Sequence, residues 1–139
     1  MKKLCHKNKI NFFLSNDVKL AIKLDLDGVY IPSFNSSFSH NSFNFKKKFK
    51  IIGSAHNLKE IRIKEKQNIS LIFLSSIFKN SKNKKFLGIY KFLKLMRLTK
   101  KDIVCLGGVN EKNIKQINLL NLNKIASISM FQKLLKNNE

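Results

Sequence analysis

The segment Ile103-Val104-Cys105-Leu106-Gly107-Gly108-Val109-Asn110 joins a short apolar run to a glycine turn, and an amphipathic stretch follows it. The same plan appears earlier in the chain. Asn16-Asp17 follows the apolar run Phe12-Phe13-Leu14, and Gly53-Ser54-Ala55-His56-Asn57 follows Ile51-Ile52. Repeated strand-loop-helix units place their polar turns on one rim of the fold, where chemistry usually occurs. We therefore expect the functional residues in these turns.

Apolar runs alternate with helical periodicity along the whole chain. We predict strands at 11–15, 28–31, 50–53, 70–75, 102–106 and 124–128, and helices at 17–24, 58–66, 89–98, 111–119 and 130–135. In the helix 89–98 one face carries Ile89, Phe92, Leu93 and Met96, a spacing that predicts core packing. The alternation favours a parallel sheet with right-handed crossovers. Residues 32–48 are expected to form a long loop with one helical turn.

The composition predicts one domain with a real core. The chain has 139 residues and 43% hydrophobic content. Its two cysteines, Cys5 and Cys105, follow neither disulfide nor metal-site spacing, so we expect reduced thiols in a cytoplasmic protein. The longest apolar stretch, residues 69–78, is interrupted by serines and predicts no membrane span, and the basic start leads into no signal-peptide core.

The formal net charge of +20 raises the question of nucleic-acid binding. Of the 28 basic residues only Arg62 and Arg97 are arginine, the side chain that reads phosphate and guanine bidentately. An abundance of Asn, Ile and Phe points to a general compositional bias toward lysine. We expect no specific nucleic-acid partner. Neither a Rossmann G-x-G-x-x-G nor a P-loop signature is present in the sequence.

Taken in order, six short signatures resemble the thiamine-phosphate synthase/TenI family, whose members are (β/α)8 barrels. The matching segments are Asn16-Asp17-Val18-Lys19-Leu20-Ala21, Asp27-Gly28-Val29-Tyr30-Ile31, Gly53-Ser54-Ala55-His56, Ser75-Ser76-Ile77-Phe78, Gly107-Gly108-Val109-Asn110 and Ile128-Ser129. They correspond to the third to eighth strands of the family. The resemblance therefore implies an α/β fold, an incomplete TIM-type barrel in which residues 1–139 form one domain with about six of the eight βα units.

The resemblance also implies a reaction. The family enzyme joins hydroxymethylpyrimidine pyrophosphate to thiazole phosphate, releasing pyrophosphate and giving thiamine phosphate, and Mg²⁺ helps the pyrophosphate leave. Small phosphorylated molecules are then the expected partners. Asp17, at the end of a strand, is a suitable Mg²⁺ ligand, and Asn16 beside it is expected to contact the pyrophosphate. The other reading of Asp17 is a charge at a helix N-terminus. Ser54, in the Gly53-Ser54-Ala55-His56 segment, is a further residue expected to be catalytic.

The phosphate of the second substrate is expected to bind after the seventh and eighth strands. Gly107 and Gly108 let backbone N–H groups approach it, and Ser129 completes the cup. A tight turn is the structural reading of the two glycines, and a helix N-cap that of Ser129. Lys82 or Lys84 would supply charge from the preceding loop, where the stretch Asn80-Ser81-Lys82-Asn83 departs from the family's Thr-x-Thr-Lys.

Two further departures weaken the match. Asn35 stands at or near the second magnesium carboxylate of the family, so the expected metal would be held less tightly. Residues 1–10 resemble the helix before the third strand, so the first two units, with a Gln-x-Arg-x-Lys arm for pyrophosphate, are expected to be absent. The sequence then describes a truncated reading frame, a decayed copy, or a piece that pairs with a complementing chain or a second copy of itself.

Three functions remain open at this point. The first is the transferase. The second is a TenI-like thiazole tautomerase, which needs no magnesium and in which His56 moves the proton. A structural loop histidine is the competing reading of His56. The third is a noncatalytic remnant that binds a phosphorylated ligand or no ligand.

Overall fold

The computed structural model describes residues 1–80, 85–120, 122, 124–130 and 132. The chain divides into two compact units, Met1–Ile72 and Phe73–Glu139. Six strands lie within the described residues, and their order in the sheet, β1-β2-β3-β4-β5-β6, is their order along the chain. Sequential strand order with a helix between successive strands is the topology of (β/α) barrels.

The first unit alternates helices and parallel strands. Its elements are α1 (Lys2–Lys7), β1 (Phe13–Ser15), α2 (Val18–Lys23), β2 (Gly28–Ile31), the 3-10 helix η1 (Ser39–Ser42), β3 (Lys50–Ala55) and α3 (Leu58–Lys66), and β4 (Leu71–Leu74) begins at its end. β2 pairs in parallel with both β1 and β3, with Val29 opposite Leu14 and Ile51. Parallel strands direct their carboxyl ends to one edge, so the turns after β1, β2 and β3 share an edge.

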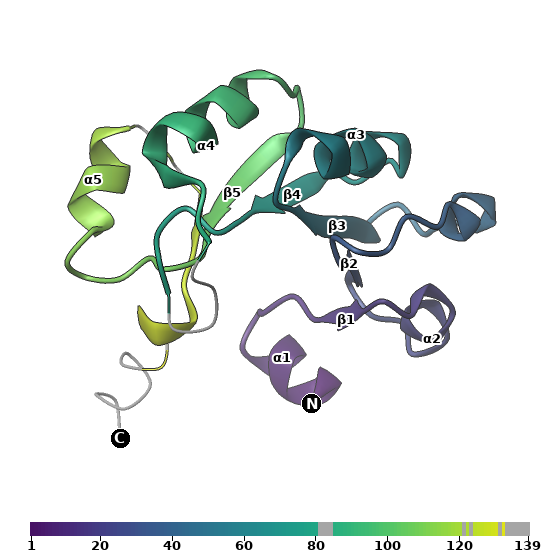
Figure 1. The fold of residues 1–139 in the computed structure, drawn as a ribbon. Helices are drawn as coiled ribbons and strands as arrows, with labels where there is room; N and C mark the ends of the chain where they lie inside the picture. Colours follow the sequence, from purple (N-terminus) through teal and green to yellow (C-terminus); the bar gives the residue numbers. More distant parts are fainter. Residues whose placement is uncertain (81–84, 121, 123, 131, 133–139) are drawn as a thin grey trace. The chain divides into compact units, whose positions relative to one another are not determined.

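The core of the first unit lies between this sheet and its helices. α2 packs against β1 and β2, and α3 packs against β3 (Figure 1). The buried apolar side chains are Ala21, Leu26, Val29, Ile31, Ile52, Ala55, Ile61, Ile69 and Ile72. Burying one such branched side chain contributes roughly 1.5–3 kcal/mol. Asp27 fixes the strand starts, because its Oδ2 accepts from the Phe12 backbone N–H at 2.8 Å and its carbonyl from the Lys50 N–H at 3.0 Å.

The second unit continues the same pattern. It contains α4 (Gly88–Arg97), β5 (Asp102–Leu106), α5 (Ile114–Leu119) and β6 (Ile125–Ala126), and β5 pairs in parallel with β6. Of the predicted apolar stripe of α4, Phe92 is fully buried and Ile89, Leu93 and Met96 are half-buried, while Leu95, which the prediction left out, is buried. Cys105 is a buried free thiol whose pKa is raised to about 12 by burial, so it is an inert core residue.

Most predicted elements are confirmed, and the differences have local causes. β2, α3 and β5 have the predicted bounds, and η1 is the helical turn expected within residues 32–48. α5 begins at Ile114 and not at residue 111, because Asn110 and Asn113 form a turn in which Asn113 Oδ1 accepts from the Asn110 N–H at 2.9 Å. β6 ends at Ala126, two residues early, since a helical turn begins at residue 128. Among the described residues, every helix is too short or too polar to cross a membrane.

Candidate functional site

The predicted site residues fall into two groups, one in each unit. We call the first group, Asn16, Asp17 and Asn35, the asparagine edge. Asn16 follows β1 in the left-handed region, with φ +61°, a conformation that asparagine tolerates better than most side chains. Its backbone N–H donates to the Tyr30 carbonyl at 2.8 Å, and its Oδ1 accepts from Asn35 Nδ2 at 2.6 Å. The turns after β1 and β2 are thus joined by their own side chains.

Asp17 has a structural role as well as the predicted metal-binding one. Its Oδ1 accepts from the Leu20 N–H at 2.9 Å, which makes Asp17 the N-cap of α2. The carboxylate is exposed at the edge. Mg²⁺ in phosphate-transfer sites is held by one or two carboxylates and by the substrate's own phosphates. One carboxylate beside the Asn16 amide fits a Mg²⁺ ion that is bound mainly through pyrophosphate.

Asn35, the predicted departure from the family pattern, is built into this edge. Its Oδ1 accepts from the Ser37 N–H at 2.8 Å while its Nδ2 donates to Asn16. Both polar atoms of the amide are therefore used within the protein. Among the described residues no three His, Cys, Asp or Glu side chains gather as a metal cluster.

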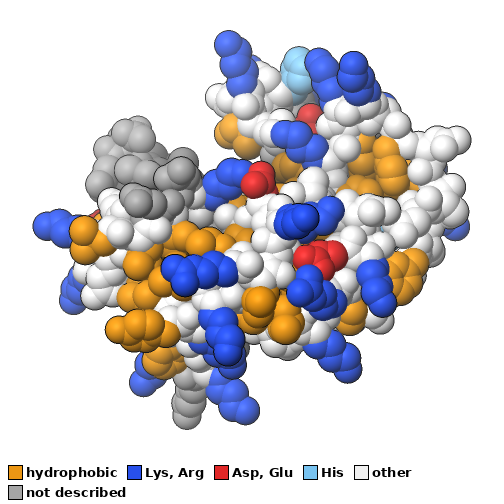
Figure 2. Space-filling view, turned by 90° about the horizontal axis from the view of Figure 1, so that it is seen from above, with side chains coloured by type: hydrophobic (Ala, Val, Ile, Leu, Met, Phe, Trp, Pro, Cys, Tyr) orange, Lys and Arg blue, Asp and Glu red, His pale blue; other side chains and the backbone are white. Residues whose placement is uncertain are grey.

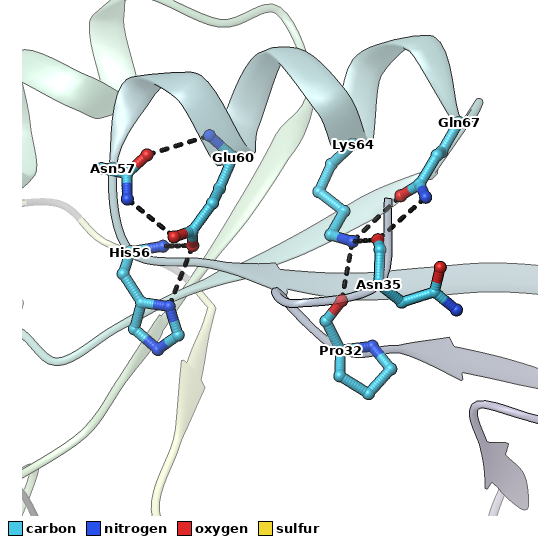
Figure 3. A network of polar contacts seen from close by, with 7 residues as sticks. All are labelled: Pro32, Asn35, His56, Asn57, Glu60, Lys64 and Gln67. Atoms are coloured by element: carbon cyan, nitrogen blue, oxygen red, sulfur yellow. Dashed lines mark hydrogen bonds and ion pairs between the residues drawn. The ribbon is translucent and has the colours of Figure 1, made fainter. Parts of the chain in front are cut away.

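The histidine predicted as a proton carrier lies in a capping box at the start of α3 (Figure 3). Glu60 Oε2 accepts from the His56 N–H at 2.7 Å and lies 2.9 Å from His56 Nδ1. Glu60 Oε1 accepts from Asn57 Nδ2, and Asn57 Oδ1 accepts in return from the Glu60 N–H. This network favours the structural reading of His56. Ser54 precedes it in β3 and is buried, with 5% exposure.

The second group lines a pocket of about 470 Å³ in the second unit, which we call the glycine pocket. Its lining residues are Lys79, Asn80, Leu106, Gly107, Gly108, Val109, Asn110, Ser127, Ile128, Ser129 and Gln132. Three of the predicted phosphate-binding residues, Gly107, Gly108 and Ser129, are thus brought together. Lys82, the fourth, lies outside the described residues.

Glycine is required at both turn positions of this pocket. Gly107 and Gly108 have φ angles of +94° and +73°. A Cβ on Gly107 would lie 2.3 Å from Ser76 Oγ, and one on Gly108 would lie 2.7 Å from the carbonyl oxygens of Phe78 and Lys79. The segment after β4 therefore packs directly on the glycine turn, and the Phe78 N–H donates to the Gly107 carbonyl at 3.1 Å. Tight packing and phosphate binding both favour glycine here.

Two serines form the other side of the glycine pocket. Ser127 is buried, its hydroxyl donates to the Val109 carbonyl at 2.7 Å, and its Oγ accepts from the Met130 N–H at 3.3 Å. The cap of the helical turn is therefore Ser127 and not Ser129, so the N-cap reading of Ser129 is wrong. Ser129 is exposed, and its Oγ lies 3.3 Å from Ser127 Oγ.

Sequence reasoning missed three residues of this pocket. Lys79 is exposed at its rim, Asn80 donates from Nδ2 to Ser76 Oγ at 3.0 Å, and Ser127 supports Ser129. The charge expected from Lys82 or Lys84 is thus available at Lys79. A signal existed for Lys79, because it directly follows the Ser75-Ser76-Ile77-Phe78 segment at the end of β4.

Known proteins resemble this chain over nearly its whole length. The family model described as thiamine monophosphate synthase matches residues 1–131. The thiamine-phosphate synthase of Persephonella marina is 25% identical, and thiamine-phosphate synthase 1 of Streptococcus pneumoniae is 28% identical. Each match covers 93% of this chain and 63% of the relative, so the chain spans less than two thirds of those proteins.

The fold has a solved counterpart. A thiamine phosphate pyrophosphorylase from Pyrococcus furiosus superposes with a TM-score of 0.74 at 22% identity, over 92% of this chain and 62% of that one. The architecture is accordingly an incomplete TIM-type barrel, as predicted. Together with the match of the family model to residues 1–131, this shows that the chain belongs to the thiamine monophosphate synthase family.

Proposed function

We propose that this chain is a thiamine-phosphate synthase-like transferase that joins hydroxymethylpyrimidine pyrophosphate to thiazole phosphate and releases pyrophosphate. The glycine pocket is the observation that carries the proposal. Two glycines with positive φ, a serine pair and Lys79 surround a space of about 470 Å³, a size that suits a small phosphorylated molecule. In the family resemblance β5 and β6 correspond to the seventh and eighth strands of the barrel. TIM barrels commonly bind phosphate in the loops after these two strands, which supports the proposal.

In this proposal the glycine pocket holds thiazole phosphate. Backbone N–H groups at the Gly107-Gly108 turn approach the phosphate closely because no Cβ intervenes. Ser129 Oγ lies 3.3 Å from Ser127 Oγ and 3.4 Å from the Val109 carbonyl, and its hydroxyl turns from these acceptors to donate to a phosphate oxygen. Lys79 adds positive charge at the rim. The pocket thereby fixes the ring that attacks the pyrimidine, which lowers the entropic part of the barrier.

The asparagine edge serves the pyrophosphate. The bond between the pyrimidine methylene carbon and the pyrophosphate oxygen breaks, and its electron pair leaves with the pyrophosphate. Asn16, held by Asn35 at 2.6 Å, is placed to donate from its amide to that leaving group. Mg²⁺, held by Asp17, would neutralise part of the developing negative charge. Ser54 is buried near the end of β3 and belongs to the proposal as a supporting residue.

Under this proposal the partners of the chain are small phosphorylated substrates, and the chain acts in the cytoplasm. A nucleic-acid partner is not part of the proposal. On the face drawn in Figure 2, Lys and Arg side chains project from several separate places, interspersed with hydrophobic and neutral groups. A duplex reader would gather its basic residues along one stripe or element.

The direct test incubates the purified chain with both substrates and Mg²⁺ and measures thiamine phosphate by chromatography. Product formation that is lost on removal of Mg²⁺ supports the proposal. Calorimetric titrations decide between the three functions. Magnesium-dependent binding of pyrophosphate indicates the transferase, and magnesium-independent binding of thiazole phosphate indicates the tautomerase. The absence of heat with either ligand would contradict both and leave the noncatalytic remnant.

A further inference from the structure

Lys64 is a fully buried lysine on α3, with 0% exposure. Lysine is almost never buried unless its charge is satisfied. Its Nζ donates to the Pro32 carbonyl at 2.7 Å, to the Asn35 carbonyl at 2.8 Å and to Gln67 Oε1 at 2.9 Å (Figure 3). An ammonium group has three N–H donors, and all three have an acceptor here.

Gln67, one turn further along, holds the same loop from the same side. Its Nε2 donates to the Asn35 carbonyl at 3.0 Å and to the Ser37 carbonyl at 2.8 Å. Its own carbonyl lies 2.8 Å from Nε2 of the buried His40 in η1. Lys64 and Gln67 therefore satisfy three carbonyls in the loop that follows β2. Neither residue belongs to the sequence signatures of the family resemblance.

Asn35 connects this buried network to the asparagine edge. Its carbonyl accepts from both Lys64 and Gln67, while its side chain extends away from them (Figure 3) and donates from Nδ2 to Asn16 Oδ1 at 2.6 Å. We propose that Lys64 is a positioning residue for the pyrophosphate side of the site: it anchors the backbone of Asn35 so that the Asn35 amide holds Asn16. The choice of pyrophosphate as the ligand rests on the proposed function. The anchoring of Asn35 and Asn16 by Lys64 is independent of it.

The charges around Lys64 suit an anchoring ammonium. Glu60 lies one turn earlier on the same helix, and its carboxylate favours the charged lysine. The loop after β2 places two carbonyl oxygens next to the ammonium group. Gly53 in β3 lies against the apolar stem of the lysine, since a Cβ on this glycine would lie 3.4 Å from Lys64 Cδ. Burial lowers the pKa of Lys64 to about 8, so the ammonium form predominates at neutral pH. An apolar residue here would leave the Pro32 carbonyl without this donor.

The test compares Lys64→Met with Lys66→Met in the full chain. Lys66 is exposed on the same helix, so both variants lose one positive charge but only the first loses the anchor. Two quantities are measured: the NMR signals of the Asn16 backbone amide and the Asn35 side-chain amide, and the affinity for pyrophosphate with Mg²⁺ by calorimetry. In Lys64→Met we expect both signals to move and the affinity to fall about tenfold or more, as for the loss of outer-shell support in other metal sites. In Lys66→Met both quantities should remain as in the wild type.

Unchanged Asn16 and Asn35 signals in a folded Lys64→Met protein would overturn the proposal, as would equal effects of the two variants. If the wild-type chain binds no pyrophosphate, the proposed function fails, and the NMR signals decide the positioning role by themselves. If Lys64→Met does not fold, Gln67→Leu decides. It removes the two bonds from Gln67 Nε2 to the loop and the Oε1 acceptor of Lys64, and it leaves the two bonds from Lys64 to the loop. It should move the Asn35 signal if the anchor acts as proposed.

Discussion

Asn35 Nδ2 donates to Asn16 Oδ1 at 2.6 Å, so the loop after β2 holds the residue that follows β1. The contact joins two residues that are far apart in the sequence but lie on one edge of a parallel sheet. In the family pattern the position at or near Asn35 carries a carboxylate. This chain has an amide that donates a hydrogen bond, so position 35 is neutral where the family resemblance implies a metal-binding carboxylate.

Asn35→Asp should therefore strengthen magnesium-dependent binding of pyrophosphate. The substitution adds a carboxylate to the edge that contains Asp17, and a hard divalent cation favours carboxylate oxygen. The bond from the Ser37 N–H is retained because Oδ1 still accepts, and the link to Asn16 is retained when the Asn16 amide turns so that its Nδ2 donates to the new carboxylate. We expect a several-fold gain in affinity, equivalent to about 1 kcal/mol for an exposed charge near a cation. Isothermal titration with pyrophosphate at fixed Mg²⁺ measures it.

The control for this gain is Asn41→Asp, which makes the same change of charge at an exposed position in η1. Equal affinities in the two variants would mean that net charge, and not a new ligand, is responsible. A weaker affinity in Asn35→Asp than in the wild type would show that the amide bond to Asn16 is the more important contribution.

Gly108→Ala should destabilise the protein more than Gly88→Ala. Both glycines have φ +73°, so both substitutions incur the cost of a left-handed alanine, about 1 kcal/mol. At Gly108 the new Cβ would also lie 2.7 Å from two carbonyl oxygens, whereas nothing lies within 4 Å of it at Gly88. Overpacking typically adds about 1–3 kcal/mol. Urea unfolding of the two variants measures the difference, and equal losses would contradict the close packing of the glycine turn.

Asn57→Ala should cost about 1 kcal/mol of stability, because it removes the N-cap of α3 and one partner of Glu60. His56→Ala should cost less, since the backbone N–H of residue 56 still donates to Glu60. If His56 is structural, its replacement also leaves any thiazole tautomerisation rate unchanged. Thermal unfolding and a tautomerisation assay on the two proteins check both statements. Loss of tautomerisation in His56→Ala alone would restore the proton-carrier reading.

The sequence predicted the parts of the fold that depend on local pattern. Apolar runs with sharp polar ends predicted the bounds of β2 and β5, and an amphipathic stretch predicted those of α3. The helical spacing around Phe92 placed this residue on the buried face of α4. The end of β6 was missed because Ile128 continues the apolar pattern, while Ser127 stops the strand by capping the following turn. Competition between a strand and a side-chain cap depends on tertiary contacts, here the bond from Ser127 to the Val109 carbonyl.

The candidate site was predicted only where its residues stand in recognisable turns. Gly107, Gly108 and Asn16 could be found in that way. Lys64 could not, because a lysine in an amphipathic helix reads as an exposed residue. Its burial follows from carbonyl oxygens of Pro32 and Asn35, which are distant in the sequence and belong to a loop without a regular pattern. A long-range polar network of this kind has no local signature.

Lys64 should also make the stability of the protein depend on alkaline pH. Burial lowers its pKa from 10.5 to about 8, so between these values the unfolded chain binds a proton that the folded chain has released. Where the unfolded state binds more protons, the free energy of unfolding rises with pH. The contribution of Lys64 is therefore smallest below pH 8 and increases toward pH 10.5, by up to about 3 kcal/mol.

Urea unfolding from pH 7 to pH 10.5 isolates this contribution when wild type, Lys64→Met and Lys66→Met are compared. All lysines other than residues 64 and 66 are common to the three proteins, so their effects cancel in the comparison. The wild type and Lys66→Met should show the same rise in unfolding free energy, whereas Lys64→Met should lack the part due to the buried ammonium. Parallel curves for the three proteins would mean that Lys64 keeps an ordinary pKa. In that case its three carbonyl and amide acceptors would compensate the desolvation of the ammonium group almost completely.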